Sequence, residues 1–438
     1  MNPIDKCLET QARAKKYIPG MGQLLSKRPD MFSLGVWPSY YAKAKGAEIW
    51  DLDGNHYIDM SISGIGANIL GYADPDVDAA VKAAIDNGSS ASLNCVEEVD
   101  LAEEMCRLHP WAHQARFARS GGEAMAIAVR IARAHTGRDK VAICGYHGWH
   151  DWYLAANVGT ENALGEHLIP GLSPAGVPKA LKGTTLTFRY NHLEDLVAIV
   201  QEHEHELAAI VMEPVRNMQP VAGFLGGVSV LAKECGAVFI FDEISSGFRM
   251  NCGGAHLLYG VDPDMAVFSK ALGNGYPIAT ILGRANVMES AQLSFISSTM
   301  WTERIGPTAA LATIKKFETQ GVAAHINRLG KMVQEGWELA AKNTGLDIHV
   351  SGIYPLSHFA FPDNAGVKKA FFIQEMLSAG FLASNLYYPM FAHTDKQVRS
   401  YLGAVEKVFS RIVQLEKENI LEMNLKGKPA SAGFKRVT

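Results

Sequence analysis

A lysine and an aspartate each stand at the end of an apolar stretch in the middle of this sequence. Lys270 follows Met265–Phe268 with one residue between, and Asp242 ends Ala237–Asp242. A lysine is rarely buried unless it is paired or functional, and desolvation lowers the pKa of its amine, as a nucleophile for Schiff-base chemistry requires. Asp242 could contact a ligand or a metal, or could only cap a helix, so by itself it leaves these alternatives open.

Two glycines precede another candidate element, the helical pattern Glu123–Ala134. Ser120, Gly121 and Gly122 stand directly before it. The N–H groups and the dipole at a helix N-terminus favour an anion, and a phosphate would fit there. Ser120 could equally be an ordinary N-cap, so this motif alone leaves both interpretations open.

A segment rich in aromatic residues and histidine, GYHGWHDW, covers Gly145–Trp152 and follows the apolar stretch Val141–Cys144. An aromatic side chain at a strand end can stack on a flat ligand. His147, His150 and Asp151 are also residue types that bind zinc. No further ligand lies at a useful spacing, and we therefore expect no metal site in this segment.

Short apolar stretches that alternate with helical patterns must position these groups. The predicted strands are Val141–Cys144, Ala208–Met212, Ala237–Asp242, Met265–Phe268 and Ile278–Leu282, and the helices between them include Glu123–Ala134 and Leu193–His203. Strands that are apolar throughout and separated by helices indicate an α/β fold, with a mainly parallel sheet covered on both faces. Such sheets bind ligands at the carboxyl ends of their strands, which is where the candidate residues stand.

Further predicted elements flank this central region on both sides. They are a hairpin over Ala47–Asp59 with its turn at Asp53-Gly54, and helices over Val77–Ile85, Val96–Leu108 and from Ile305 to about Thr344. We expect one large domain over residues 75–310, which carries the site. A smaller α+β domain would be built from residues 1–74 and 311–438 together.

Composition excludes several classes of function. The 438 residues carry a formal net charge of −4, so no general electrostatic argument favours nucleic acid or an anionic membrane surface. No apolar run reaches the ~18–20 residues of a membrane span, and the polar N-terminal residues do not resemble a signal peptide. Six scattered cysteines without a CxxC pair indicate reduced thiols and a cytoplasmic protein.

Taken together, the candidate groups describe one ligand. A phosphate cradle, a stacking aromatic residue, an aspartate and a lysine follow one another along the predicted sheet in this order. A flat, phosphorylated aldehyde that contains a pyridine ring would use all four. These features describe pyridoxal 5′-phosphate (PLP).

With these motifs, the sequence resembles the class III family of fold-type-I PLP-dependent aminotransferases, most of all its branch containing glutamate-1-semialdehyde 2,1-aminomutase. The matching stretches cover nearly the whole chain, from Ala47–Asp59 to about residue 395. The resemblance implies this fold, and PLP that is converted to pyridoxamine 5′-phosphate between two half-reactions. The most specific motifs are Ser120–Lys140, Gly145–Asp151, MEPV (Met212–Val215), IFDEISSGFR (Ile240–Arg249) and SKALGNGYP (Ser269–Pro277).

The resemblance also implies roles for individual residues. Lys270 would bind PLP covalently and then move a proton, and Asp242 would pair with the pyridine nitrogen. Tyr146 and Ile244 would pack on opposite faces of the ring. Thr299 would reach the phosphate held by a neighbouring subunit, which implies a homodimer with shared active sites. The other implied cofactor contacts are Ser120, Gly121, Gly122, His147, Glu213 and Ser245.

The departures from the family pattern concern mainly the substrate. Gly122 replaces a Ser or Thr that is frequent in the family, and Ser245 stands where many members have Gln. The arginine that would bind a semialdehyde carboxylate has no secure counterpart, and aromatic and polar side chains suggest a different entrance to the site. The candidate substrate contacts are Arg28, Trp149, His150 and Trp301.

We therefore predict an aminotransferase that moves an amino group from a donor such as glutamate to an aldehyde or ketone, with a sugar-derived carbonyl compound as one candidate acceptor. An intramolecular aminomutase would use the same residues and keep one substrate through both half-reactions. Another PLP reaction, such as elimination, epimerisation or decarboxylation, and a non-catalytic PLP-fold protein are the remaining alternatives.

Overall fold

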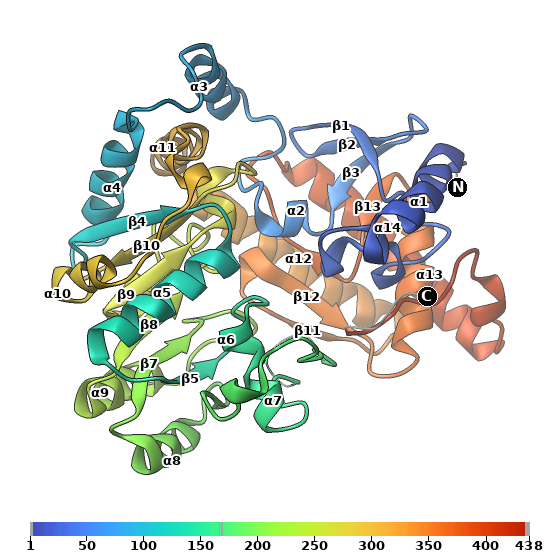
Figure 1. The fold of residues 1–438 in the computed structure, drawn as a ribbon. Coiled ribbons are helices and arrows are strands. Elements are labelled where there is room, and N and C mark those ends of the chain that lie inside the picture. The colour runs from blue at the N-terminus through green and yellow to red at the C-terminus, as the bar shows by residue number, and fades with distance from the viewer. Residues whose placement is uncertain (1–2, 166, 168–169, 434–438) are drawn as a thin grey trace. The chain divides into compact units, whose positions relative to one another are not determined.

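The computed structural model describes residues 3–165, 167 and 170–433 (Figure 1). The chain forms two units, one of which contains both chain ends. This unit comprises Met1–Asp74 and Ala324–Thr438, and the other comprises Pro75–Ala323.

Seven strands form the sheet of the larger unit. They are β4 (Gln114–Ala118), β5 (Lys140–Cys144), β6 (Thr185–Thr187), β7 (Leu207–Met212), β8 (Val238–Asp242), β9 (Met265–Phe268) and β10 (Ala279–Gly283). Their order in the sheet is β4-β10-β9-β8-β7-β5-β6. β10 pairs antiparallel with β4 and β9, and the other neighbouring strands are parallel. All five predicted strands form, and the prediction of a mainly parallel sheet is confirmed.

The sequence does not predict β4 or β6, which lie at the two edges of this sheet. β4 is mostly half-buried and carries a charged residue, Arg116, at its centre, and β6 has only three residues. An edge strand has one neighbouring strand and needs no continuous apolar pattern. These two strands therefore lack the signal by which the central strands are recognised.

Helices cover both faces of the sheet. Those of the larger unit are α3 (Pro75–Asp86), α4 (Val96–Leu108), α5 (Gly121–Thr136), α6 (Asp151–Leu154), α7 (Ala156–Gly159), α8 (Leu193–His203), α9 (Phe224–Cys235), α10 (Ala285–Met288) and α11 (Ile305–Thr319). Every residue of β7 and β8 is buried, and because side chains alternate between the faces of a sheet, both faces must be covered. α5 packs against β7, β9 and β10, and α9 packs against β7 and β8.

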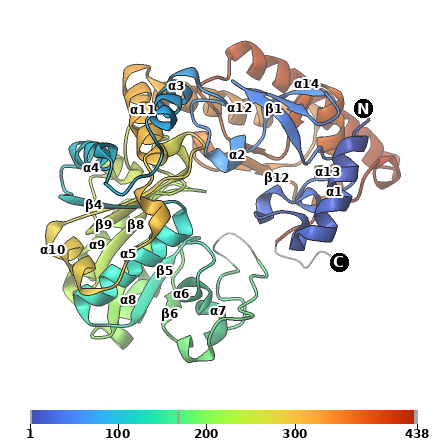
Figure 2. The ribbon, with the colours of Figure 1, turned by 45° about the horizontal axis from the view of Figure 1, so that its top comes forward.

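The larger unit extends beyond the boundary expected at residue 310. It continues to Ala323 because α11 packs on α3 and α4 (Figure 2). A helix that covers two helices of the same unit belongs to the core of that unit. The helical pattern after residue 305 alone could not assign α11 to one domain or the other.

The smaller unit is assembled from both ends of the chain. Its strands are β1 (Tyr41–Lys45), β2 (Glu48–Asp51), β3 (His56–Met60), β11 (His349–Ser351), β12 (Ser357–Ala360), β13 (Phe381–Ala383) and β14 (Leu386–Tyr387). β2 and β3 form the predicted hairpin, and β13 from the C-terminal part pairs parallel with β3. The other three-stranded sheet has the order β11-β12-β14. The helices of this unit are α1 (Asp5–Tyr17), α2 (Ser63–Gly66), α12 (Val322–Thr344), α13 (Ala365–Ser378) and α14 (Asp395–Lys417).

Helix α1 is fastened to the hairpin by carboxylates. Asp53 accepts hydrogen bonds from the backbone N–H groups of Lys6 (2.9 Å) and Cys7 (3.1 Å). Asp51 accepts from the backbone N–H groups of Asp53 (2.9 Å) and Asn55 (2.8 Å). Cys7, Asp51 and Asp53 lie close enough for their ligand atoms to share a cation, but these hydrogen bonds give the two carboxylates a structural role.

Helix length and composition also bear on membrane insertion. The two longest helices, α12 and α14, have 23 residues each and carry charged side chains along their length. Within the part of the chain that the structure describes, no helix is both long enough and apolar enough to cross a bilayer.

Candidate active site

Lys270 lies two positions after the last residue of β9, at the carboxyl edge of the large sheet. Its Nζ donates a hydrogen bond to Oγ of Ser245 (2.7 Å), which lies in the loop after the neighbouring strand β8. The backbone of Lys270 has φ 47°, a left-handed conformation that is uncommon for a residue with a side chain. Such a conformation has a cost, and positions that retain one cluster at functional sites.

The surroundings of Lys270 favour the neutral amine. Burial, followed by the positive charges of Arg216 and Arg249, lowers the pKa of Lys270 to about 7. The carboxylates of Glu213 and Asp242 act in the opposite direction and do not cancel this effect. A lysine with this pKa is substantially neutral near pH 7, which is the state in which its nitrogen can attack a carbonyl carbon.

Asp242 is the last residue of β8 and is almost fully buried. Its Oδ2 accepts a hydrogen bond from Nδ1 of His147 (2.8 Å), and its Oδ1 accepts one from the backbone N–H of Ile244 (3.0 Å). These two contacts fix the orientation of the carboxylate. Nε2 of His147 is buried and has no hydrogen-bond partner among the described residues. The Asp242–His147 pair therefore keeps one nitrogen atom whose hydrogen bond these residues do not provide.

Tyr146 and Ile244 come from the loops after β5 and β8. Tyr146 is held by its backbone N–H, which donates to Oε2 of Glu213 (3.2 Å), and its ring packs edge-on against Tyr153. Ile244 lies against the start of α5, because a Cβ atom added to Gly121 would be 2.8 Å from its Cδ1. Tyr146 and Ile244 pack against the same hydrophobic core.

The N-terminus of α5 is enclosed by the segment that follows β5. Ser120 is the N-cap residue, and Glu123 accepts hydrogen bonds from the backbone N–H groups of Arg119 (3.0 Å) and Ser120 (3.4 Å). A Cβ atom on Gly122 would lie 3.2 Å from Nδ1 of His150. A Cβ atom on Gly148 would lie 3.0 Å from Cα of Gly122. The glycines therefore allow a close approach of the two segments.

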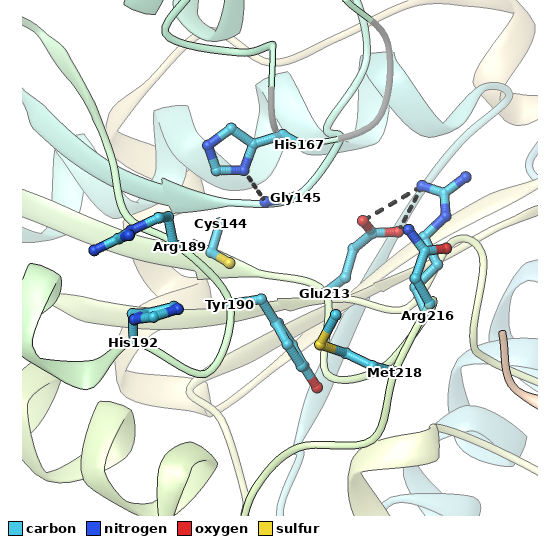
Figure 3. Close-up of a pocket in the computed structure, with 10 residues that line it drawn as sticks. Cys144, Gly145, His167, Arg189, Tyr190, His192, Glu213, Arg216 and Met218 are labelled. Carbon is cyan, nitrogen blue, oxygen red and sulfur yellow. Dashed lines mark hydrogen bonds and ion pairs between the residues drawn. The ribbon is translucent and has the colours of Figure 1, made fainter. Parts of the chain in front are cut away.

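A cavity of about 240 Å³ lies at the carboxyl ends of β5, β6 and β7 (Figure 3). Glu213, buried at the end of β7, is 3.0 Å and 3.4 Å from Nη1 of Arg216 through its two oxygens. Nδ1 of His167 accepts a hydrogen bond from the backbone N–H of Gly145 (3.1 Å). The lining residues are Cys144, Gly145, His167, Arg189, Tyr190, His192, Glu213, Arg216, Asn217 and Met218.

Two arginines that the sequence analysis did not select belong to this region. Arg216 lines the cavity, and its charge acts on Lys270. Arg249 is fully buried, and its Nε donates to the backbone carbonyl of Ser245, which braces the loop that carries the hydroxyl partner of Lys270. Both residues stood beside recognised motifs, Arg216 three residues after Glu213 and Arg249 at the end of Ile240–Arg249.

The aromatic candidates lie near the start of α5 in different surroundings. Trp149 is mostly exposed and stacks on the ring of His150, with ring centroids 4.3 Å apart. The backbone carbonyl of Trp301 accepts a hydrogen bond from Nη2 of Arg119 (2.8 Å), the residue before the N-cap. Thr299, two residues earlier, is exposed.

Arg28 lies in the smaller unit, whereas the other predicted site residues belong to the larger one. It is buried, and its Nε and Nη2 donate to the two carboxylate oxygens of Asp30 at 3.0 Å and 2.7 Å. Its charge therefore already has a carboxylate partner. Arg28 stays a predicted substrate contact.

Comparisons with known proteins agree on one family. The family model described as "Aminotransferase class-III" matches residues 34–409. The chain is 30% identical to 3-aminobutyryl-CoA aminotransferase of Cloacimonas acidaminovorans (strain Evry), over 92% of this chain and 96% of that protein. It is 33% identical to glutamate-1-semialdehyde 2,1-aminomutase of Desulfitobacterium hafniense (strain DSM 10664 / DCB-2), over 89% and 94%. The PLP internal aldimine form of the FumI protein of Sphingopyxis sp. MTA144 has the same fold, with a TM-score of 0.86 at 23% identity over 97% of this chain and 99% of that chain.

Proposed function

This chain belongs to the class III aminotransferases, a family of PLP-dependent enzymes, and we propose that it transfers an amino group from an amino-acid donor to an aldehyde or ketone through Lys270. The observation that carries this proposal is the position of the Lys270 amine beside the Asp242 carboxylate. A lysine amine with a pKa of about 7 lies at the carboxyl edge of the sheet, one strand from the oriented carboxylate of Asp242.

The residues around Lys270 fit PLP. The start of α5 offers the backbone N–H groups of Gly121 and Gly122 for a phosphate, next to the N-cap residue Ser120. Nε2 of His147 is buried and has no hydrogen-bond partner among the described residues, so the chain leaves this contact to a ligand. The missing side chain at Gly121 leaves room for Ile244 beside the start of α5. When bound, PLP supplies a pyridine ring that accepts electrons from the carbon beside the amino group.

Each side chain then has a distinct task. Asp242 would accept a hydrogen bond from the pyridine nitrogen, and His147 holds the Asp242 carboxylate in position for it. Tyr146 and Ile244 would pack on the two faces of the ring. Lys270 would take a proton at Nζ from the carbon of the donor and deliver it to the cofactor, and the neutral state favoured by its surroundings suits this task. The hydroxyl of Ser245 orients Nζ, and Glu213 fixes the backbone of Tyr146.

A donor that carries a carboxylate, such as glutamate, is supported by the charges of the cavity. Arg216 lies at the cavity wall, where its Nη1 pairs with Glu213, and its positive charge acts on Lys270 electrostatically. We propose that a donor carboxylate would share this guanidinium group with Glu213. Guanidinium groups bind carboxylates with two parallel hydrogen bonds. We infer that the substrate enters on this side, with Trp149, His150 and Trp301 as further candidate contacts around the start of α5.

The chain is also proposed to act as a cytoplasmic homodimer with shared sites. Around Thr299, Leu293, Phe295 and Met300 are 78%, 86% and 61% exposed. Scattered exposed apolar side chains are ordinary, but three in one short segment form a patch of the kind that a second copy would cover. Thr299 would then reach the phosphate bound by the partner subunit, and the six free cysteines suit a reducing compartment.

Lys270→Ala tests the central claim. This variant is expected to lose the absorption band of lysine-bound PLP and all measurable turnover. Lys140→Ala, which removes a lysine paired with Glu206 at the opposite end of β5, is the matched control and should keep both. Turnover by Lys270→Ala with the band intact would refute the assignment.

The reaction type is tested by following the cofactor and the carbonyl substrate together. Each amino donor is added to the enzyme, and conversion of the PLP form to the pyridoxamine form is recorded. An aminotransferase then consumes an external keto acid, aldehyde or ketone in equal amount to restore the PLP form. An aminomutase restores it from its own intermediate without an external acceptor, and that result would replace the proposal.

A further inference from the structure

The side chain of His150 has one ring nitrogen atom, Nδ1, for which the described residues provide no hydrogen bond. Its Nδ1 is shielded from solvent and has no hydrogen-bond partner among the described residues. Buried polar atoms in native proteins are nearly always hydrogen-bonded, so each exception calls for an explanation. The ring is not loosely placed, because it stacks on Trp149 at an interplanar angle of 27°.

This nitrogen atom lies against the start of α5, at Gly122. A Cβ atom on Gly122 would be 3.2 Å from Nδ1 and 3.3 Å from Cε1 of His150. Gly122 lies within the helix and its backbone is not in the left-handed region, so the backbone does not require glycine there. Glycine is a poor helix former, and the close approach of the imidazole ring gives a physical reason for its presence.

The same place is the anion-binding end of the helix. The first N–H groups of a helix have no acceptor within it, and α5 is long enough, at 16 residues, to have a developed dipole. Glu123 accepts from the N–H groups of Arg119 and Ser120. The N–H groups of Gly121 and Gly122 therefore remain available for a ligand that also reaches Nδ1 of His150.

We propose that His150 donates a hydrogen bond from Nδ1 to the phosphate of PLP, and that Gly122 lacks a side chain so that the imidazole can occupy this position. The proposal rests on the placement of PLP under the proposed function. It changes the expected role of His150 from a substrate contact to a cofactor contact. It also supplies the side-chain donor that a Ser or Thr at position 122 would otherwise provide.

The first test compares two forms of the cofactor that differ only in the phosphate. PLP is removed from the enzyme, and the dissociation constants of PLP and of pyridoxal are measured by the absorbance of the lysine-bound form. His150→Ala is expected to weaken PLP about 10- to 100-fold, as loss of a hydrogen bond to a charged group would. Pyridoxal binding should stay within about twofold of the original protein, because pyridoxal has no phosphate for His150 to contact.

His150→Asn is the conservative control. Its side-chain N–H can reach the position of Nδ1, so PLP affinity should recover in large part. Equal weakening of PLP and pyridoxal in His150→Ala would show a structural role and overturn the inference. Unchanged affinity for both would overturn it as well, and neither outcome bears on the Lys270→Ala test of the proposed function.

The second test exchanges the two donors. Gly122→Ser alone places its Cβ against His150 and is expected to weaken PLP binding. In the double variant Gly122→Ser/His150→Ala the tight contact is absent and the hydroxyl would take the place of the imidazole, so PLP should bind more tightly than to His150→Ala. If Gly122→Ser is equally harmful with and without His150, the steric part of the proposal is wrong. If Lys270→Ala keeps the band of lysine-bound PLP, the proposed function fails first, which separates the two failures.

Discussion

Two carboxylate–histidine pairs stand side by side at the end of β8, and they differ in how they are completed. Asp242 is 2.8 Å from Nδ1 of His147, and Glu243 is 2.7 Å from Nδ1 of His256. All four side chains are buried. Asp242 ends β8 and Glu243 is the first residue after it, and the two carboxylates bind different histidines in different surroundings.

The pair of Glu243 is closed within the protein. Oε1 of Glu243 also accepts the backbone N–H of His256 (2.9 Å), and Oε2 accepts the hydroxyl of Ser246 (2.5 Å). Nε2 of His256 accepts a hydrogen bond from Nε1 of Trp111 (2.9 Å). Although burial acts to raise the pKa of Glu243, the contacts with His256 and Ser246 hold it below its usual value. This pair fixes the chain around residue 256.

The pair of Asp242 is open, since Nε2 of His147 has no partner among the described residues and Lys270 lies one strand away. A buried ionic group that is fully satisfied by its own chain stabilises the fold. A similar group with unused capacity at a strand end can serve a ligand. The comparison therefore separates a structural pair, that of Glu243, from the pair of Asp242, for which we propose a role in binding the cofactor.

The largest expected effect is on catalysis at the open pair. Asp242→Asn should lower kcat by a factor on the order of 10²–10³, because the amide cannot supply a negative charge to the pyridine nitrogen. The urea midpoint of unfolding should change little, since the volume and one hydrogen-bond acceptor are kept. Steady-state kinetics and urea unfolding measure both quantities, and full activity would contradict the functional assignment of this pair.

Glu243→Ala should produce the opposite result. Removing one member of a buried pair costs about 3–5 kcal/mol, because the remaining polar groups lose their partners. We expect a clear fall in the urea midpoint and a smaller loss of turnover per folded molecule than in Asp242→Asn. A variant that unfolds at the original midpoint would show that the closed pair does not stabilise the fold.

Ser245 and Ser246 should show the same difference between an effect on activity and an effect on stability, with smaller magnitudes. Ser246→Ala removes the hydroxyl that donates to Glu243 and should destabilise the protein by about 1–3 kcal/mol. Ser245→Ala removes the hydroxyl that accepts from Lys270 and should lower kcat several-fold with little change in stability. Measuring both quantities for both variants tests the comparison, and equal effects on stability would contradict it.

The smallest expected effect is a shift in a pH profile. The rate at which PLP binds to the stripped enzyme should rise with pH around a midpoint near 7, because the neutral amine of Lys270 reacts. Arg216→Gln should move this midpoint to higher pH, since a positive charge that disfavours the protonated amine is lost. Arg189→Gln is the control. Arg189 lines the same cavity and, like Arg216, pairs with a carboxylate, but the positive charges that lower the pKa of Lys270 are those of Arg216 and Arg249.

The lowered pKa of Lys270 also predicts how the free energy of unfolding changes with pH. Between the folded value of about 7 and the unfolded value of 10.5, the unfolded chain binds more protons at this residue. The free energy of unfolding of the PLP-free enzyme should therefore gain a contribution that grows with pH across this window. Lys270→Met should lack this contribution, which urea unfolding at several pH values would detect.

Much of the fold was predictable because the central strands are apolar over their whole length. Such stretches must be buried on both faces, and this requires helices between them and a parallel sheet. The order of Gly121, Tyr146, Asp242 and Lys270 after successive elements then indicated PLP and the class III family, and both predictions are confirmed. The edge strands β4 and β6 were not predicted, because a partly exposed strand has no continuous apolar stretch.

The residue types at the ends of the central strands could be predicted from the sequence alone, because each strand is a continuous apolar stretch whose end is visible in the sequence. It could not determine which of two adjacent acids, Asp242 and Glu243, has spare capacity, because Trp111, which completes the Glu243 network, is 145 residues from His256. Nor could it pair Gly122 with His150 or bring Arg216 beside Lys270. Those contacts depend on the path of the chain between distant segments, and only the tertiary structure decides them.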